Sequence, residues 1–123
     1  MASKEVDIKL SISAFISDEY VAEDRVRLEL YRRLSRAQRV HELLEIEEEM
    51  VDRFGKLDVP TKQFMQLIEM KILAAQKGIV LISNYTQMIT VKYENEQKIT
   101  LQSRSRDDDD LIATVLSHLR KEA

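Results

Sequence analysis

Four acidic side chains of one segment stand at helical spacing and have the chemistry to bind a basic partner. Glu45, Glu48, Glu49 and Asp52 lie at offsets of 0, 3, 4 and 7 residues, which collects them along one ridge of a helix. Because four like charges repel one another, such a ridge is more stable when a positively charged surface docks on it. Ionic binding to another protein surface is therefore one interpretation of the spacing. The alternative is a helix face that is simply solvated.

Arginine is concentrated in the segment that precedes this ridge, with only Glu29 opposing it between the first and last of the set. The arginines are Arg25, Arg27, Arg32, Arg33, Arg36 and Arg39. A stripe of this kind can follow a phosphate backbone, although Tyr31 is its only aromatic residue and the whole chain is acidic. The second interpretation is that a basic and an acidic helix, joined by a short turn, pack together and pair some of these ions.

No residue pattern points to catalysis, a metal or a cofactor. His41 and His118 have no acid or second histidine at a ligand offset, and a strand-turn-helix nucleophile motif is absent. The consecutive carboxylates Asp107 to Asp110 splay around a helix start, where they are expected to cap backbone donors and interact with the helix dipole. We therefore expect no catalytic residues, no bound metal and no cofactor; a small hydrolase is the last of the possible functions.

Composition indicates one compact domain over residues 1–123. The chain has 19 basic and 22 acidic residues, a net charge of -3, 44% hydrophobic residues, two glycines and no cysteine. Its longest uncharged stretch, Gly78 to Val91, is too polar to span a bilayer. We expect a cytoplasmic protein without membrane contact, in which residues 1–5 are disordered or derive from cloning.

The first half of the chain is expected to form an extended segment and three helices. Val6, Ile8, Leu10 and Ile12 alternate with polar residues, which indicates a strand or an extended arm. Helices are predicted from Asp24 to Arg36, from Val40 to Phe54, and from Pro60 to about Lys77. Gly55 suits a left-handed cap of the second helix, whose expected apolar positions are Val40, Leu43, Leu44, Met50, Val51 and Phe54.

The second half is expected to form three strands and a final helix. The strands are predicted at Ile79–Ser83, Thr86–Tyr93 and Lys98–Ser103, with the last two paired as a hairpin. The last helix carries an apolar stripe of Leu111, Ile112, Val115, Leu116 and Leu119. Because strands and helices are segregated along the chain, the fold class is α+β: a three-helix N-terminal part, a small antiparallel three-stranded sheet and a C-terminal helix.

Several stretches resemble a known family. Residues 49–55 read EMVDRFG and are followed by Pro60, which resembles the Glu-Leu-Ile-Asp-Arg-Phe-Gly segment near the C-terminus of bacterial transcription-repair coupling factors (the Mfd family). Residues 18–21, DEYV, and 27–34, RLELYRRL, resemble upstream stretches of that family, and residues 71–74, KILA, and 77–79, KGI, resemble downstream ones. The agreement runs from about Val6 to Ile82. Ser17 departs from it, because the family usually has proline there.

The resemblance implies a non-catalytic C-terminal regulatory domain of a much larger ATP-dependent DNA translocase, which displaces stalled RNA polymerase. In that family the domain is understood to pack on the protein's own N-terminal module, masking the surface that recruits the damage-recognition ATPase of nucleotide excision repair. The motif carboxylates correspond to Glu49 and Asp52 in this chain, which the family implies face basic groups of that module. Glu45, Glu48 and Arg53 complete the candidate partner interface, in which Arg53 alternatively turns back onto the acidic pair. A nucleic-acid-binding module built on the arginine-rich helix is the alternative function.

Overall fold

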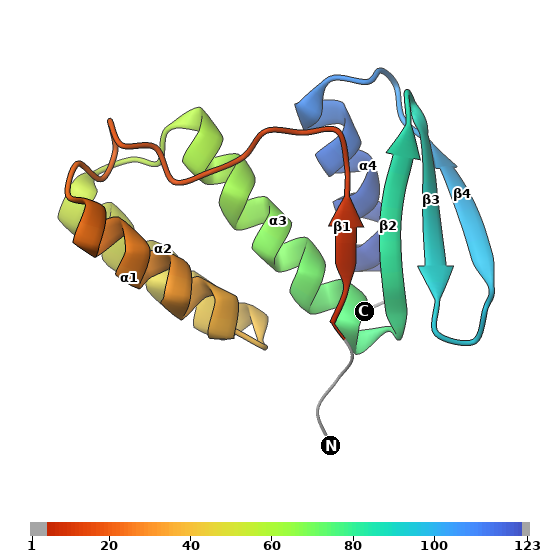
Figure 1. Cartoon of the computed structure of the whole chain (residues 1–123), viewed down its shortest axis with the longest axis horizontal. Coiled ribbons are helices and arrows are strands. Elements are labelled where there is room, and N and C mark those ends of the chain that lie inside the picture. The colour runs from red at the N-terminus through yellow and green to blue at the C-terminus, as the bar shows by residue number, and fades with distance from the viewer. Residues whose placement is uncertain (1–4, 122–123) are drawn as a thin grey trace. The chain divides into compact units, whose positions relative to one another are not determined.

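Figure 1 shows the chain in a computed structural model, which describes residues 5–121. The elements are β1 (Asp7–Lys9), α1 (Asp24–Arg36), α2 (Val40–Phe54), α3 (Val59–Gln76), β2 (Ile79–Tyr85), β3 (Met88–Tyr93), β4 (Lys98–Gln102) and α4 (Asp108–Lys121). The α+β class with a C-terminal helix is confirmed. Packing divides the chain into two compact units, one of residues 14–72 and the other of residues 1–13 and 73–123. The single domain over 1–123 stays a prediction, and residues 1–4 lie outside the described residues.

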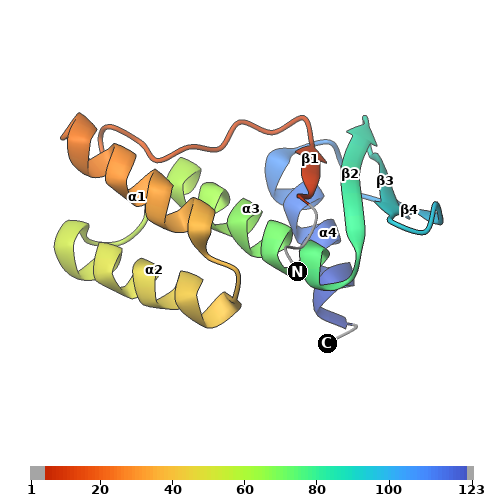
Figure 2. The ribbon, with the colours of Figure 1, turned by 60° about the horizontal axis from the view of Figure 1, so that its bottom comes forward.

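The unit of residues 14–72 is built on a helical hairpin. The three-residue link 37–39 reverses the chain, so that α2 lies beside α1 (Figure 2). Both helices bury one apolar stripe against the first part of α3 and the segment that enters α1, because an amphipathic helix is stable only when its apolar face is covered. The buried residues of this core are Ile16, Val21, Leu30, Leu34, Leu43, Ile46, Met50, Met65 and Ile72.

The buried stripe of α2 differs from the sequence prediction at three positions. Ile46, which the prediction omitted, is buried together with Leu43 and Met50. Leu44 and Val51, which the prediction placed on the buried side, have 54% and 42% of their surface exposed. The offsets of 0, 3 and 7 residues from Leu43 define the side that faces the core, and Leu44 and Val51 each lie one residue further around the helix. The exposed face of α2 is therefore partly apolar.

Local hydrogen bonds fix the ends of α2 and the start of α3. The carboxylate of Glu42 accepts hydrogen bonds from the backbone N–H groups of Gln38 and Arg39, both at 3.0 Å. Gly55 has a positive φ of 88°, as expected, but its ψ of -169° lies outside the left-handed helical region that the sequence suggested. Asp58 accepts a hydrogen bond from the N–H of Thr61 at 3.1 Å, which places Pro60 in the first turn of α3, where proline is tolerated.

The other unit contains a four-stranded mixed sheet with the order β1-β2-β3-β4. The three predicted strands form the expected antiparallel meander, and β3 and β4 form the expected hairpin. The predicted count of three strands is one too low, because β1 pairs in parallel with β2, Ile8 standing opposite Ile82. A parallel partner strand more than 70 residues away leaves no local sequence signal. The alternating residues of the first segment therefore predict only a strand or an extended arm.

The last helix, α4, contacts β4 and buries its predicted stripe. Leu111, Ile112, Val115, Leu116 and Leu119 are each at most 2% exposed, so this prediction is confirmed. Between residues 5 and 121, no helix combines the length and apolar character needed to cross a membrane.

Candidate functional site

The six carboxylates of α2 differ in their exposure and in their hydrogen-bond partners. Glu42 caps the helix start, Glu47 is half-buried, and Glu49 is bound by arginines. The remaining three are exposed, and within the described part of the chain no hydrogen bond or ion pair reaches their side chains: Glu45, Glu48 and Asp52. The ridge predicted from sequence therefore contains three unneutralised carboxylates and one that is paired.

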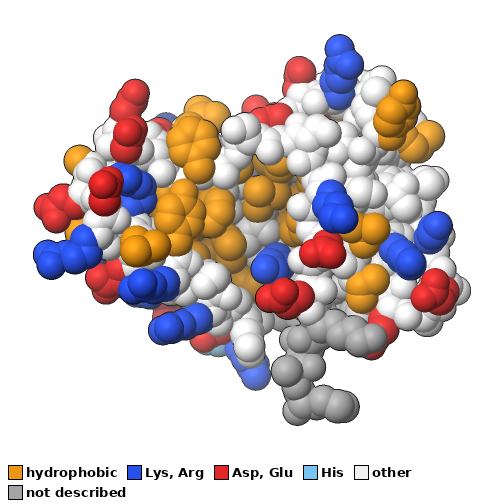
Figure 3. All heavy atoms as spheres, viewed as in Figure 1, with side chains coloured by type: hydrophobic (Ala, Val, Ile, Leu, Met, Phe, Trp, Pro, Cys, Tyr) orange, Lys and Arg blue, Asp and Glu red, His pale blue; other side chains and the backbone are white. Residues whose placement is uncertain are grey.

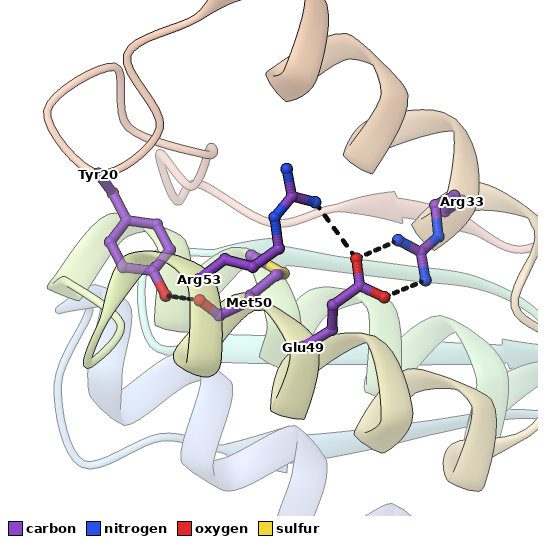
Figure 4. Close-up of polar contacts among 5 residues, drawn as sticks. All are labelled: Tyr20, Arg33, Glu49, Met50 and Arg53. Carbon is purple, nitrogen blue, oxygen red and sulfur yellow. Dashed lines mark hydrogen bonds and ion pairs between the residues drawn. The ribbon is translucent and has the colours of Figure 1, made fainter.

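Glu49 lies between the two helices of the hairpin (Figure 4). Arg33 on α1 donates two hydrogen bonds to its carboxylate, Nη1 to Oε2 at 2.7 Å and Nη2 to Oε1 at 3.0 Å. Arg53, one turn further along α2, approaches Oε2 with its Nη1 at 3.3 Å. Two arginines thus neutralise this carboxylate inside its own unit, as the interpretation of paired helices expected for part of the set.

The same contacts set the protonation of Glu49. The hydrogen bond from Arg33 lowers the pKa of the Glu49 carboxyl below its ordinary value, against a smaller opposing effect of burial. The bond likewise raises the pKa of the Arg33 guanidinium. Glu49 therefore remains ionised and paired at neutral pH, while its side chain is still 39% exposed.

Tyr20, which the sequence analysis did not single out as a site residue, holds the C-terminal end of α2. Its hydroxyl hydrogen-bonds to the carbonyl oxygens of Gly55 at 2.6 Å and Met50 at 3.2 Å. Its ring packs edge-on against Phe54, and the guanidinium of Arg53 lies 4.9 Å from the centre of the Phe54 ring. Burial, followed by the nearby charges of Asp58 and Glu47, raises the pKa of Tyr20. The sequence signal for Tyr20 is the DEYV stretch of residues 18–21, which carries part of the family resemblance.

The exposed face of α2 combines negative charge with apolar surface. Leu44 and Val51 flank Glu48 on this face, with offsets of 4 and 3 residues from it. Mixed surfaces of this kind are typical of protein interfaces, where apolar contact supplies affinity and charge supplies orientation. What the face can bind is therefore a complementary protein surface with basic groups around apolar residues.

The arginines of α1 are likewise divided. Arg27 donates to the carbonyl of Val21 at 2.6 Å and pairs with Asp24, and Arg33 is engaged by Glu49. Arg25, Arg32 and Arg36 are exposed, and their side chains make no ion pair with any described residue. Basic side chains follow the course of α1 across the surface in Figure 3.

The remaining candidates do not assemble into a site. Among residues 5–121 there is no group of three or more potential ligands placed to hold a metal. The run Asp107 to Asp110 instead contacts its own loop, since Asp110 accepts the hydroxyl hydrogen bond of Ser105 at 2.6 Å. The Nε2 atom of His118 is buried without a hydrogen-bond partner in the described structure.

The order of elements in this chain, with a helical hairpin and a mixed four-stranded sheet, matches the fold of a known protein domain. A crystal structure of the C-terminal domain of transcription-repair coupling factor superposes with a TM-score of 0.86, covering 98% of this chain and 95% of that one at 15% identity. The TRCF domain model matches residues 10–103, and the chain belongs to this family. This match confirms the resemblance and extends it beyond Ile82.

Two curated relatives are much longer than this chain. It is 49% identical over 117 residues to the transcription-repair-coupling factor of Helicobacter pylori (strain ATCC 700392 / 26695), covering 95% of this chain. It is 28% identical over 87 residues to that of Staphylococcus aureus (strain USA300), covering 71% of this chain. The chain spans 12% and 7% of the length of these two proteins.

Proposed function

We propose that this chain is the C-terminal regulatory domain of a transcription-repair coupling factor and acts without catalysis, as an interaction domain. It packs on the N-terminal module of the same parent protein and masks the surface that recruits the damage-recognition ATPase of nucleotide excision repair. The parent protein is an ATP-dependent DNA translocase that displaces stalled RNA polymerase, and the domain works in the cytoplasm without direct membrane contact. Membership of the TRCF domain family supports this proposal.

The observation that carries the proposal is the set of unpaired carboxylates on α2. Glu45, Glu48 and Asp52 are exposed and have no basic partner among the described residues, and exposed apolar side chains lie beside them. Unpaired like charges on one helix face are unfavourable in isolation and become favourable when basic groups dock on them. A polar interface of this kind is also of modest strength, which release by a competing partner requires.

Glu49 and Arg53 have a supporting part in this proposal. Arg33 and Arg53 already engage the Glu49 carboxylate, so a docking partner would have to displace them before it could bind this residue directly. We therefore assign direct ionic contact to Asp52 and Glu48. Glu49 instead holds α1 and α2 together, and with them the geometry of the exposed face.

The test is a binding measurement between this chain and the separately produced N-terminal module, by isothermal titration calorimetry. Glu48→Ala with Asp52→Ala should weaken binding about tenfold or more, since removing charges that meet a complementary surface costs both orientation and affinity. Asp18→Ala with Glu19→Ala is the matched control, because it removes two exposed acids of the same unit outside α2. Equal affinity of the α2 double variant and the parent chain would contradict the proposal.

The alternative, nucleic-acid binding, is favoured by the exposed and unpaired Arg25, Arg32 and Arg36. Binding through phosphates would weaken steeply as salt increases and would be lost in Arg32→Ala with Arg36→Ala. A fluorescence anisotropy titration of labelled DNA at several salt concentrations checks this. Such binding together with an unaffected module interaction would make the arginine helix a second functional surface.

A further inference from the structure

β4 forms one edge of the four-stranded sheet (Figure 1), and among residues 5–121 no strand pairs with its outer side. Just after β4, the N–H of Ser103 donates a hydrogen bond to the carbonyl of Gln87, next to β3, at 2.9 Å. The direction of the backbone polar groups alternates along an antiparallel strand. The N–H and C=O groups of Lys98, Thr100 and Gln102 therefore point to the open edge, where an added strand can bond to them.

The two faces of β4 differ in chemistry. Ile99 and Leu101 are half-buried, and they stand opposite two fully buried residues of β3, Val91 and Ile89. They therefore lie on the buried face of the sheet without being fully covered. The other three residues are exposed on the opposite face: Lys98, Thr100 and Gln102. The edge thus offers free backbone hydrogen bonds together with incompletely covered apolar surface.

The order of residues along β4 is complementary to its own reverse. When two copies run antiparallel with Thr100 opposite Thr100, Ile99 meets Leu101 and Lys98 meets Gln102. Threonine pairs and apolar pairs are favourable across antiparallel strands, and no like charges stand directly opposite each other in this register. The smallest shift that keeps the same backbone groups facing one another is two residues. Such a shift leaves two residues of each β4 without a partner in the other.

We propose that β4 pairs edge to edge with β4 of a second copy of this chain, antiparallel and centred on Thr100. A two-fold axis perpendicular to the sheet, passing between the two Thr100 residues, generates the whole contact. It reverses the strand direction and keeps the buried faces of both sheets on the same side. The three residues of each strand that point outward then form hydrogen-bonded pairs, and the two sheets become one. The pairing uses no residue of α2, so it is independent of the docking function proposed above.

Charges beyond the two ends of β4 favour a second copy as the added strand. The loop before β4 carries Glu96, whose side chain is 83% exposed and lies 3.7 Å from Lys92. The segment after β4 carries Arg104, which is exposed and forms no ion pair with any described residue. Glu96 and Arg104 are each four residues from Thr100, so the antiparallel arrangement brings the acid of one copy beside the base of the other at both ends.

Sedimentation equilibrium of the 123-residue chain measures the association. We expect a weak dimer, with a dissociation constant on the order of 1 mM, because the paired strands are short. Thr100→Pro should weaken association about tenfold or more, since proline lacks the outward N–H and an edge strand tolerates it at such a position. Thr100→Val is the matched control, because it keeps the N–H and the branched side chain, and it should change association by less than about twofold.

A change of charge tests the same register without disturbing the backbone. Gln102→Glu places a carboxylate opposite Lys98 of the other copy, twice in each dimer, and should strengthen association several-fold at low salt. Gln102→Lys places two like charges there instead and should weaken it. Both effects should shrink as salt is raised, because the screening length shortens.

Single cysteines report the register directly, because the chain has no cysteine of its own. Thr100→Cys places two thiols across a hydrogen-bonded pair with Cα atoms about 5.5 Å apart, within the range that a disulfide accepts. Lys98→Cys, on the same exposed face, places its two thiols about 14 Å apart along the strands. Under mild oxidation Thr100→Cys should form the linked dimer about tenfold faster than Lys98→Cys. A mixture of Lys98→Cys with Gln102→Cys should link the two variants to each other.

Several outcomes would overturn the proposal. A parent chain that stays monomeric to about 2 mM is one, and equal oxidation rates of Thr100→Cys and Lys98→Cys are another. Undiminished association of Thr100→Pro, shown to be folded by far-ultraviolet circular dichroism, is a third. A monomeric parent chain that binds an extended peptide along β4 would assign the edge to a different protein strand. Glu48→Ala with Asp52→Ala should leave self-association unchanged, so the failure of the docking function and the failure of this pairing are distinguishable.

Discussion

The chain has two acidic segments, and their carboxylates are used differently. At the start of α4, Asp110 accepts a hydrogen bond from the Ser105 hydroxyl at 2.6 Å, and the Ser105 oxygen accepts one from the N–H of Asp107 at 3.0 Å. Asp108 accepts a further, longer bond from the N–H of Ser13 at 3.4 Å. On α2, no such bond reaches Glu48 or Asp52 from any described residue. A run of acidic residues therefore indicates a binding surface only where its carboxylates accept no hydrogen bonds from their own fold.

The physical reason for this difference is position within the helix. The first turn of a helix exposes unpaired N–H groups and the positive end of the helix dipole, so carboxylates there are stabilised by their own chain. The sequence predicts that the aspartates cap these donors directly, but Asp110 instead accepts a hydrogen bond from the serine of the preceding loop. The middle of a helix has no free backbone donors, so charges there must find side chains or a partner.

The largest effect that separates the two segments is expected from Asp110→Ala. This change removes the hydrogen bond from Ser105 and a favourable charge in the first turn, and should lower the free energy of unfolding by about 1 to 2 kcal/mol. Urea unfolding followed by circular dichroism measures it. Asp52→Ala is the matched control and should change stability by less than about 0.5 kcal/mol. Equal losses in both variants would abolish the distinction drawn between the segments.

A smaller effect is expected within α2 itself, from Glu49→Gln. The pair with Arg33 is bidentate but more than a third exposed on both sides, so solvent reduces its value to about 0.5 to 1 kcal/mol of unfolding free energy. A double-mutant cycle with Arg33→Gln isolates the interaction. If Glu49→Gln has no effect while Asp52→Asn is destabilising, the assignment of paired and unpaired carboxylates is reversed.

The contribution of Glu49 should also depend on pH in a defined direction. Because Arg33 lowers the pKa of the folded carboxyl below its ordinary value of 4.5, the stabilisation is present above that value and is lost as pH falls through the lower folded pKa. The difference in stability between the parent chain and Glu49→Gln should therefore stay constant from neutral pH to about 5 and close below about 4.5. A difference that grows on acidification would contradict this sign.

The sequence predicted most of the fold because its elements are locally patterned. The stripe of α4, the strand meander and the limits of α1 follow from periodicity and turn residues, and all three are confirmed. The burial of Ile46 was missed because α2 has more apolar residues than one stripe needs, and only packing decides which of them face the core. The parallel pairing of β1 was missed because its partner is distant in the chain.

The candidate site was predicted less completely, for a related reason. Helical spacing correctly places Glu45, Glu48, Glu49 and Asp52 on one helix, but it carries no information about which neighbouring helix presents an arginine to which carboxylate. Arg33 reaches Glu49 because the hairpin link sets the register of α1 against α2. The contact of Tyr20 with the end of α2 depends in the same way on tertiary structure, across a separation of 35 residues to Gly55.

The smallest expected change is a gain in the free energy of unfolding. It tests most directly whether the carboxylates of Glu48 and Asp52 are unpaired. Glu48 and Asp52 are one turn apart, and like charges at this spacing destabilise a helix by about 0.2 to 0.5 kcal/mol. Glu48→Gln or Asp52→Asn should therefore raise the free energy of unfolding by that amount at low salt, and the gain should shrink at high salt. Thermal melts at several salt concentrations measure it. A loss of stability in either variant would mean that the side chain has a partner within its own fold, and the exposed face of α2 would then no longer be available as a docking surface.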